Sequence, residues 1–178
     1  DGVTLGMVVG KAFGGRVRYL VNDFLMNLKG LAPLCVPVNK VGGQSRDLAR
    51  LVDEAFQSGN QMIMFPAGKC SRLIDWKIQD PPWTKTFVAK SIATGRDVVP
   101  VHFIGRNSAR FYIVAKICAL LHVRFNLAMA LLPDEMVRNM HGSFKVVIGD
   151  PIPADAFDKS RSPVEWAQWV RKKVYEIE

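Results

Sequence analysis

The chain has 178 residues, of which 49% are hydrophobic and 22% are charged, and this balance excludes a disordered or fibrous protein. Its length suits one domain with a complete hydrophobic core. The 24 basic residues outnumber the 16 acidic ones and give a net charge of +8, which favours anionic partners. Nucleic acid, an anionic membrane surface and an acidic carrier protein all meet this condition, and charge alone does not choose among them.

Three cysteines, Cys35, Cys70 and Cys118, lie far apart in the sequence. This spacing favours reduced thiols in a cytosolic setting over a disulfide framework, and no set of residues with metal-ligand spacing is present, so we predict no metal. The longest apolar region covers residues 111–132 and is interrupted by charged and polar side chains. We therefore do not expect it to cross a membrane.

The predicted elements alternate between strands and helices along the chain. An apolar helical segment opens the sequence, and Ser45–Ser58 is the most clearly indicated helix, because its apolar residues recur at helical spacing and Gly59 follows it. Strands are predicted at Val17–Val21, Cys35–Val38, Met62–Phe65, Asp97–Phe103 and Phe144–Ile148. Further helices are predicted at Asn22–Leu28, Trp83–Ala93, Ala109–Leu121, 125–140 with a break at Pro133, and from Ser162 onward. Residues 73–82 are predicted to be irregular.

This alternation predicts an α/β fold, a single domain over residues 1–178 with a mostly parallel sheet flanked by helices. The sheet is expected to carry the strands around Val17, Met62, Val98 and Phe144. The buried helix faces are predicted to contain Leu48, Leu51, Val52, Ala55 and Phe56 in one helix, and Phe87, Val88 and Ile92 in the next. Because ligands of such folds bind beyond the carboxyl ends of the strands, the residues that follow each strand are the first candidates for a site.

The stretch 61–72, Gln-Met-Ile-Met-Phe-Pro-Ala-Gly-Lys-Cys-Ser-Arg, is the centre of the predicted site. A buried strand ends at Phe65, and Pro66 and Gly68 then turn the chain, since proline donates no ladder hydrogen bond and glycine permits a tight turn. Cationic and hydroxyl side chains follow the turn: Lys69, Ser71 and Arg72. Such groups suit an anion, although an ordinary basic surface turn would have the same composition.

A second turn, Gly105-Arg106-Asn107-Ser108, follows another predicted strand at the same edge and leads into a helix N-terminus. Two basic, hydroxyl-bearing turns at one edge indicate a site for a phosphate or a carboxylate. The alternative is that Arg72 and Arg106 only pair with carboxylates such as those of Asp75 or Asp80.

Other motifs are absent or have simpler explanations. The sequence contains no glycine-rich nucleotide-binding loop. His102 lies in an apolar strand and is predicted to be a core histidine. Trp76 and Trp83 are interpreted as packing or lipid-interface residues, and without a recognition module we predict no nucleic-acid partner.

The block Phe65–Ser71 resembles the Phe-Pro-Glu-Gly-Thr-Arg-Ser motif of the glycerolipid and lysophospholipid acyltransferases. Val98-Val99-Pro100-Val101 is similar to the later Val-Pro-Val block of that family. Further blocks resemble the bacterial branch labelled haemolysins, which is similar to lyso-ornithine-lipid acyltransferases: Asp80–Trp83, Gly105–Ser108, Phe111-Tyr112 and Gly149–Pro153. The resemblance covers nearly the whole chain.

The first motif of that family is His-x-x-x-x-Asp, and Asp1-Gly2 resembles its end, so the resemblance implies that Asp1 is catalytic and that the histidine lies upstream of this chain. We therefore expect a domain lacking its N-terminal part, and a fragment that is itself inactive. The central block departs from the family at Ala67, Lys69 and Cys70, which argues against glycerol 3-phosphate as the acceptor. Substrate binding is predicted for Phe65, Pro66, Gly68, Lys69, Ser71, Arg72, Arg106, Asn107 and Ser108.

The reaction that the resemblance implies is direct acyl transfer from an acyl thioester, on acyl carrier protein or coenzyme A, to the hydroxyl of a lysolipid such as a lyso-ornithine lipid or lysophospholipid. The upstream histidine would remove the hydroxyl proton, with Asp1 orienting the imidazole. No bound cofactor is implied. We expect a cytoplasmic protein peripheral to the inner face of the membrane, where its positive charge suits the anionic surface and an acidic carrier. The alternative function is a non-catalytic basic module that binds lipid or carrier.

Overall fold

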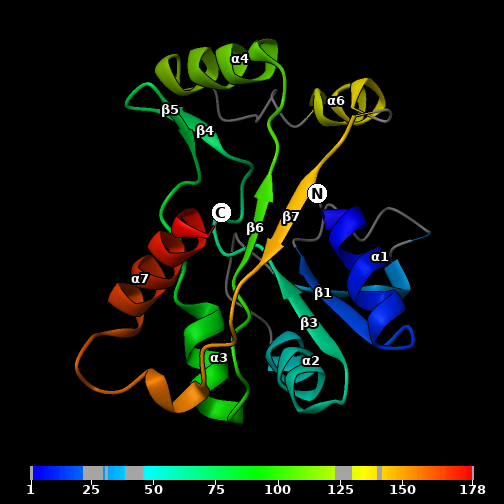
Figure 1. The fold of residues 1–178 in the computed structure, drawn as a ribbon, viewed down its shortest axis with the longest axis vertical. Helices are drawn as coiled ribbons and strands as arrows, with labels where there is room; N and C mark the ends of the chain where they lie inside the picture. The colour runs from blue at the N-terminus through cyan, green and yellow to red at the C-terminus, as the bar shows by residue number, and fades with distance from the viewer. Residues whose placement is uncertain are drawn as a thin grey trace.

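A computed structural model describes residues 2–21, 30, 32–38, 46–122, 130–139 and 142–177. Figure 1 shows a sheet flanked by helices, a separate pair of strands, β6 and β7, and the β4–β5 hairpin beside α4. The elements are α1 (Gly2–Ala12), β1 (Val17–Val21), η2 (Ala32–Leu34), β2 (Cys35–Pro37), α2 (Arg46–Gln57), β3 (Gln61–Met64), β4 (Arg72–Ile74), β5 (Lys77–Gln79), α3 (Thr86–Thr94), β6 (Val101–Ile104), α4 (Ala109–Leu120), α6 (Leu132–Arg138), β7 (Lys145–Ile148), η3 (Ala154–Ala156) and α7 (Pro163–Glu176). The predicted α/β class is confirmed.

The main sheet is three-stranded and parallel, with the order β2-β1-β3. On one face, Tyr19 and Ile63 form a cluster with Leu5 and Val9 of α1. The opposite face packs against Val52 and Phe56 of α2, in a cluster that includes Leu20, Val36, Met62 and Met64. Because neighbouring side chains of a strand point to opposite faces, this alternation places the sheet between the two helices. Strand β2, which contains Pro37, lies at the edge of this sheet.

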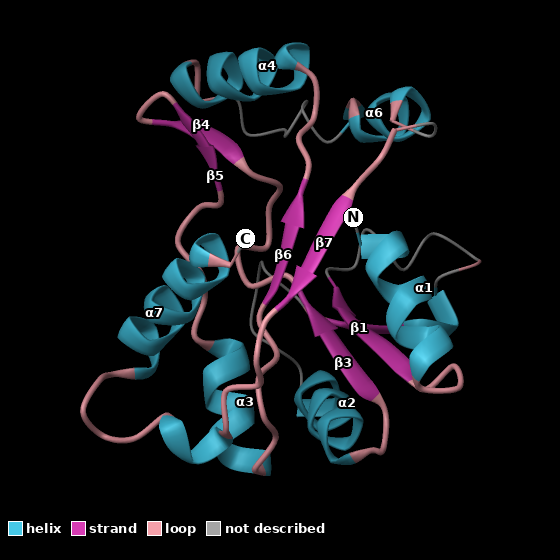
Figure 2. Ribbon diagram, in the orientation of Figure 1, coloured by secondary structure: helices cyan, strands magenta, loops and turns pink. Residues whose placement is uncertain are grey.

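The prediction that four strands share one sheet is wrong. Strands β6 and β7 pair antiparallel with each other in a sheet of their own, as Figure 2 shows, and do not join the parallel one. Val98 lies outside β6 and forms an isolated bridge with Ile152. The apolar pattern identified both strands, but strand pairing depends on contacts between distant parts of the chain, which a local pattern does not contain.

The segment predicted to be irregular contains the β4–β5 hairpin. Its two-residue turn consists of Asp75 and Trp76, which both have positive φ, at 49° and 61°. Turns of this kind usually contain Asn-Gly or Asp-Gly, because a side chain at positive φ is strained. Because a tryptophan stands at the second turn position in place of glycine, the sequence contains no signal for this hairpin.

Smaller differences concern faces and ends of helices. Leu51 and Ile92, expected in buried faces, are 45% and 48% exposed. Pro133 stands in the first turn of α6, where a proline needs no N–H partner. Ala130 is helical and Leu131 lies in a turn, so the helical stretch is interrupted just before this proline. The helix predicted at Asn22–Leu28, the predicted first residue of the next helix, Ser45, and residues 125–129 lie outside the described residues.

A second core joins α3 and α7. It contains Phe87, Val88, Phe157, Trp166, Ala167 and Val170. Ser162 begins α7 with a capping box in which its hydroxyl and the Glu165 carboxylate each accept a backbone N–H. The side-chain amide of Gln168 binds the backbone of Trp83 twice, accepting from its N–H at 3.3 Å and donating to its carbonyl at 2.7 Å. The last helix is therefore bound to the segment that follows the hairpin.

Two glycines of α1 give a matched pair of substitutions. A Cβ atom on Gly6 would lie 1.4 Å from Oη of Tyr19, whereas one on Gly10 would make ordinary contact with Val17 at 3.7 Å. We expect Gly6→Ala to lower the free energy of unfolding by about 1–3 kcal/mol through overpacking, and Gly10→Ala to raise it by up to about 1 kcal/mol through helix propensity. Urea unfolding of the two variants measures both effects. Equal effects at the two positions would show that α1 does not pack on Tyr19.

Candidate functional site

The central turn begins where β3 ends. The Gly68 N–H donates to the Phe65 carbonyl at 2.8 Å, which closes a turn with Pro66 inside it, and Gly68 has φ of 61°. The Pro66 carbonyl accepts from the backbone N–H and the hydroxyl of Thr84, at 3.0 and 3.1 Å. The strand end and turn that the sequence predicted here are thus present, and their shape depends on proline and glycine.

The start of α1 lies at the same end of β3. A Cβ atom on Gly2 would lie 3.2 Å from Cζ of Phe65, and the Tyr19 hydroxyl donates to the Gly2 carbonyl at 3.1 Å. The predicted catalytic residue, Asp1, lies outside the described residues. Its neighbour in the chain is nevertheless held against the first residue of the central turn.

Ser71 has an internal partner. Its hydroxyl donates to Oδ1 of Asp80 at 2.7 Å, and Oδ2 of the same carboxylate accepts from the Trp83 indole at 3.1 Å. The backbone N–H of Asp80 donates to the Tyr175 hydroxyl at 2.9 Å, and its carbonyl accepts from Arg171 at 2.6 Å. Ser71 therefore anchors the turn to the segment that α7 holds.

Arg72 is oriented without a carboxylate. Its Nη1 donates to the carbonyls of Cys70 and Ser71 at 2.8 and 3.1 Å, and its guanidinium lies 5.3 Å from the centre of the Phe111 ring. In the described part of the chain it forms no ion pair, so the alternative pairing with Asp75 or Asp80 is not seen. Lys69 and Arg106 are exposed and likewise have no ion pair among the described residues.

The second turn is held by a buried glutamate. Glu135 of α6 is 2% exposed, and its two carboxylate oxygens accept from the backbone N–H and the hydroxyl of Ser108, both at 2.6 Å. The Ser108 hydroxyl also caps α4 by accepting from the Phe111 N–H at 3.4 Å. The Asn107 N–H donates to the Tyr112 hydroxyl at 3.1 Å. The start of α4 is therefore fixed from two sides.

The two predicted turns meet at the first turns of α4. Cys70 and Leu73 pack against the buried cluster of Phe111, Tyr112 and Ala115. Burial raises the pKa of the Tyr112 hydroxyl, and the nearby Arg106 acts against that rise. Burial also raises the pKa of the Cys70 thiol, so this thiol stays protonated at neutral pH and is a poor nucleophile.

Sequence analysis missed the residues that support these turns. Asp80 was noted as part of a family block and as an alternative partner of the two arginines, Tyr112 was noted only as part of a family block, and Glu135 was not noted at all. An acidic residue in the first turn after Pro133 was the one available signal for Glu135. No cluster of His, Cys, Asp and Glu side chains able to hold a metal occurs among the residues that the structure describes.

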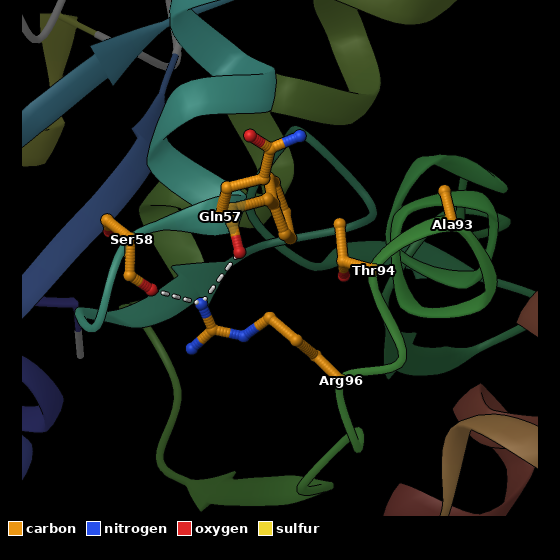
Figure 3. Close-up of a pocket in the computed structure, with 6 residues that line it drawn as sticks. Gln57, Ser58, Ala93, Thr94 and Arg96 are labelled. Atoms are coloured by element: carbon orange, nitrogen blue, oxygen red, sulfur yellow. Dashed lines mark hydrogen bonds between the residues drawn. The ribbon is translucent and has the colours of Figure 1, made fainter.

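A surface hollow lies at the opposite end of β3. Figure 3 shows Arg96 reaching across it, with its guanidinium donating to the carbonyls of Phe56 and Ser58, both at 3.0 Å. The same side chain binds the Asn60 carbonyl at 2.6 Å, just before β3 begins. Since backbone carbonyls occupy its donors, we interpret Arg96 as a structural residue.

A family model described as Acyltransferase matches residues 1–178. The chain belongs to the acyltransferase family. This acyltransferase domain is 56% identical over 177 residues to a lyso-glycine lipid O-acyltransferase of Phocaeicola vulgatus, and 55% identical to one of Bacteroides thetaiotaomicron. Both alignments cover 99% of this chain, but only 63% and 65% of the relatives. No solved structure matches it.

The family assignment agrees with the resemblance inferred from the Phe65–Ser71 block. The relatives are named for a glycine lipid, whereas the sequence suggested an ornithine-lipid or phospholipid acceptor. Within the described residues, no helix of this acyltransferase domain has the length and apolar character required to span a bilayer.

Proposed function

We propose that the full-length protein transfers a fatty acyl group from a thioester, on acyl carrier protein or coenzyme A, to the hydroxyl of a lyso-glycine lipid. The observation that carries this proposal is the identity of 56% and 55% to two lyso-glycine lipid O-acyltransferases over nearly the whole chain. The proposal replaces the lyso-ornithine lipid and lysophospholipid of the sequence analysis with a glycine lipid as the preferred acceptor.

The proposed reaction needs one base and one orienting carboxylate. A histidine five positions before Asp1, as in the His-x-x-x-x-Asp motif, takes the proton from the acceptor hydroxyl. The oxygen attacks the thioester carbonyl, the new C–O bond forms, the C–S bond breaks, and the proton passes to the departing thiolate. Asp1 orients the imidazole and stabilises its charged form. Gly2, held against Phe65, supports placing this chemistry at the carboxyl end of β3.

The charges around the turns favour a glycine headgroup. Glycine linked through its nitrogen presents one carboxylate, whereas ornithine linked in the same way presents an additional amine. Arg72 has no carboxylate partner among the described residues, and so a headgroup carboxylate can take that place. The two carboxylates beside the turns already accept hydrogen bonds, Asp80 from Ser71 and Glu135 from Ser108. They are therefore poor partners for the additional amine of an ornithine headgroup.

The test of the function uses the purified full-length protein with an acyl donor and three acceptors in separate reactions. The acceptors are a lyso-glycine lipid, a lyso-ornithine lipid and a lysophospholipid, and products are measured by mass spectrometry. We expect the highest kcat/KM with the lyso-glycine lipid. Binding of the lipids without any product would instead identify a non-catalytic lipid-binding protein, and preference for another acceptor would overturn the assignment of the headgroup.

Arg72 is the residue that we infer to bind the headgroup. We expect Arg72→Ala to lower kcat/KM for the lyso-glycine lipid by about 10- to 100-fold, the effect of losing a hydrogen bond to a charged group worth about 1.5–3 kcal/mol. Arg50→Ala removes an exposed arginine of a surface ion pair with Glu54 and should leave the kinetics unchanged. Unchanged kinetics in Arg72→Ala, with the same melting temperature as the wild type, would exclude this role.

A further inference from the structure

Helix α4 has an apolar stripe that nothing in the described structure covers. Ile113, Ile117, Leu120 and the adjoining Leu121 are 55%, 49%, 68% and 69% exposed. Their spacing places them on one side of the helix, and the opposite side holds the buried Phe111, Tyr112, Ala115 and Cys118. A helix that is apolar all round is ordinarily buried all round. The outer face of α4 therefore has the composition of a contact surface.

The hairpin adds an exposed aromatic ring beside this stripe. Trp76 at the tip of β4–β5 is 87% exposed, and Nζ of Lys116 lies 4.8 Å from the centre of its ring. Lys116 is one helical turn from Ile113 and from Leu120, so it stands at the border of the stripe. Figure 1 shows the hairpin beside α4 at one end of the molecule. The ring and the stripe thus belong to one surface.

The backbone of Trp76 gives a second indication. A bulky residue at φ of 61° is strained, and Asn or Gly would avoid that strain. The strained position holds the ring at the outermost point of the hairpin, where it gains almost no internal packing. We interpret the exposed position of the ring as the reason why a tryptophan is kept at this strained position.

The chemistry of this surface points to a lipid bilayer. Tryptophan and lysine at the edge of an apolar stripe are typical of helices that lie in the plane of a membrane interface. Lys77 and Lys116 are exposed here, Asp75 is the adjacent acid, and the chain carries a net charge of +8. This balance complements anionic lipid headgroups.

We propose that the outer face of α4 and the tip of the β4–β5 hairpin form the surface by which the protein docks on anionic membranes. The proposal rests on the lysolipid acceptor of the proposed function, because such a substrate resides in a bilayer. The same two elements carry the candidate site: β4 begins with Arg72, and α4 begins just after Ser108. Docking through them presents both turns to the lipid from which the acceptor comes.

The direct test measures co-sedimentation of the full-length protein with vesicles of phosphatidylcholine, with and without phosphatidylglycerol. We expect Ile117→Glu to reduce the partition coefficient about tenfold or more, the effect of withdrawing a buried aliphatic side chain from the bilayer. Val164→Glu introduces the same charge at a valine of α7 that is 51% exposed and should bind as the wild type does. Lys116→Ala should weaken binding only to the anionic vesicles.

Activity provides an independent readout. In Ile117→Glu, transfer to an acceptor embedded in vesicles should fall with the partition coefficient, while transfer to the same acceptor in detergent micelles should stay at the wild-type rate. Equal loss in both would mean that the site itself is damaged, and would overturn the docking role. If no acceptor is acylated at all, the proposed function fails, whereas the vesicle-binding result still decides the docking surface.

Light scattering measures the oligomeric state and so tests whether a second copy of the chain, and not a membrane, covers the stripe. A dimer that becomes monomeric in Ile117→Glu, with vesicle binding unchanged, would identify a contact between two copies and overturn the proposal. Unchanged association and unchanged vesicle binding would indicate that part of the longer chain covers the stripe, and would overturn it equally. Quenching of tryptophan fluorescence by brominated lipid, lost in Trp76→Phe, would support the proposed orientation.

Discussion

Replacing Asp1 by alanine in the full-length protein is expected to lower kcat by about 10²- to 10⁴-fold, the range of a general acid–base contribution. Asp1 would orient the imidazole of the upstream histidine and stabilise the positive charge that it gains. The loss should appear in kcat and leave KM nearly unchanged, because the carboxylate acts in the transition state and does not hold the headgroup. Steady-state kinetics with the lyso-glycine lipid measure both constants.

The control for this experiment is Asp47→Ala, which removes an exposed aspartate from the first turn of α2, outside the candidate site. It should retain wild-type kinetics. If Asp1→Ala also retained them, the His-x-x-x-x-Asp assignment would be wrong, and another residue would have to act as the base.

Glu135→Ala is expected to lower the free energy of unfolding by about 2–4 kcal/mol, because it leaves the part-buried N–H and hydroxyl of Ser108 without their acceptor and opens a cavity. The carboxylate is 2% exposed and accepts both bonds at 2.6 Å. Glu135→Gln should cost less, since the amide keeps the volume and one acceptor oxygen. The differences in unfolding free energy follow from the urea midpoints, provided that the dependence of the free energy on urea concentration is unchanged.

Glu54→Ala is the matched control, because this glutamate is 59% exposed and forms an i,i+4 pair with Arg50. Its effect should stay within about 0.5 kcal/mol. A Glu135→Ala protein as stable as the Glu54→Ala protein would show that Ser108 and the start of α4 do not depend on the buried carboxylate.

The fold was predictable where local signals were strong. β1, α4 and α7 lie where the sequence placed them, because apolar runs there are bounded by glycine, serine or proline. The hairpin was missed because Asp75 and Trp76 adopt positive φ without the usual turn residues. The pairing of β6 with β7 was missed because the two strands are far apart in the chain, and an apolar pattern does not name a partner.

In the candidate site, too, features that depend on local residues were predictable, and contacts between distant residues were not. Pro66 and Gly68 predicted the central turn, because each residue restricts or permits backbone conformations at its own position. The engagement of Ser71 with Asp80 and of Ser108 with Glu135 was beyond prediction, because the partners are 9 and 27 residues apart and meet only in the folded chain. Arg72 likewise receives its orientation partly from the Phe111 ring of a helix that follows much later.

The attachment of α7 to the segment after the hairpin has a consequence for biosynthesis. A ribosome makes the central turn first and this helix much later, yet Gln168, Arg171 and Tyr175 hold Trp83 and Asp80, and Asp80 holds Ser71. A nascent chain that ends before Gln168 lacks all the bonds from α7, and one that ends before Tyr175 still lacks the bond to the Asp80 N–H. The full set of α7 bonds to this segment can therefore form only after translation has passed Tyr175.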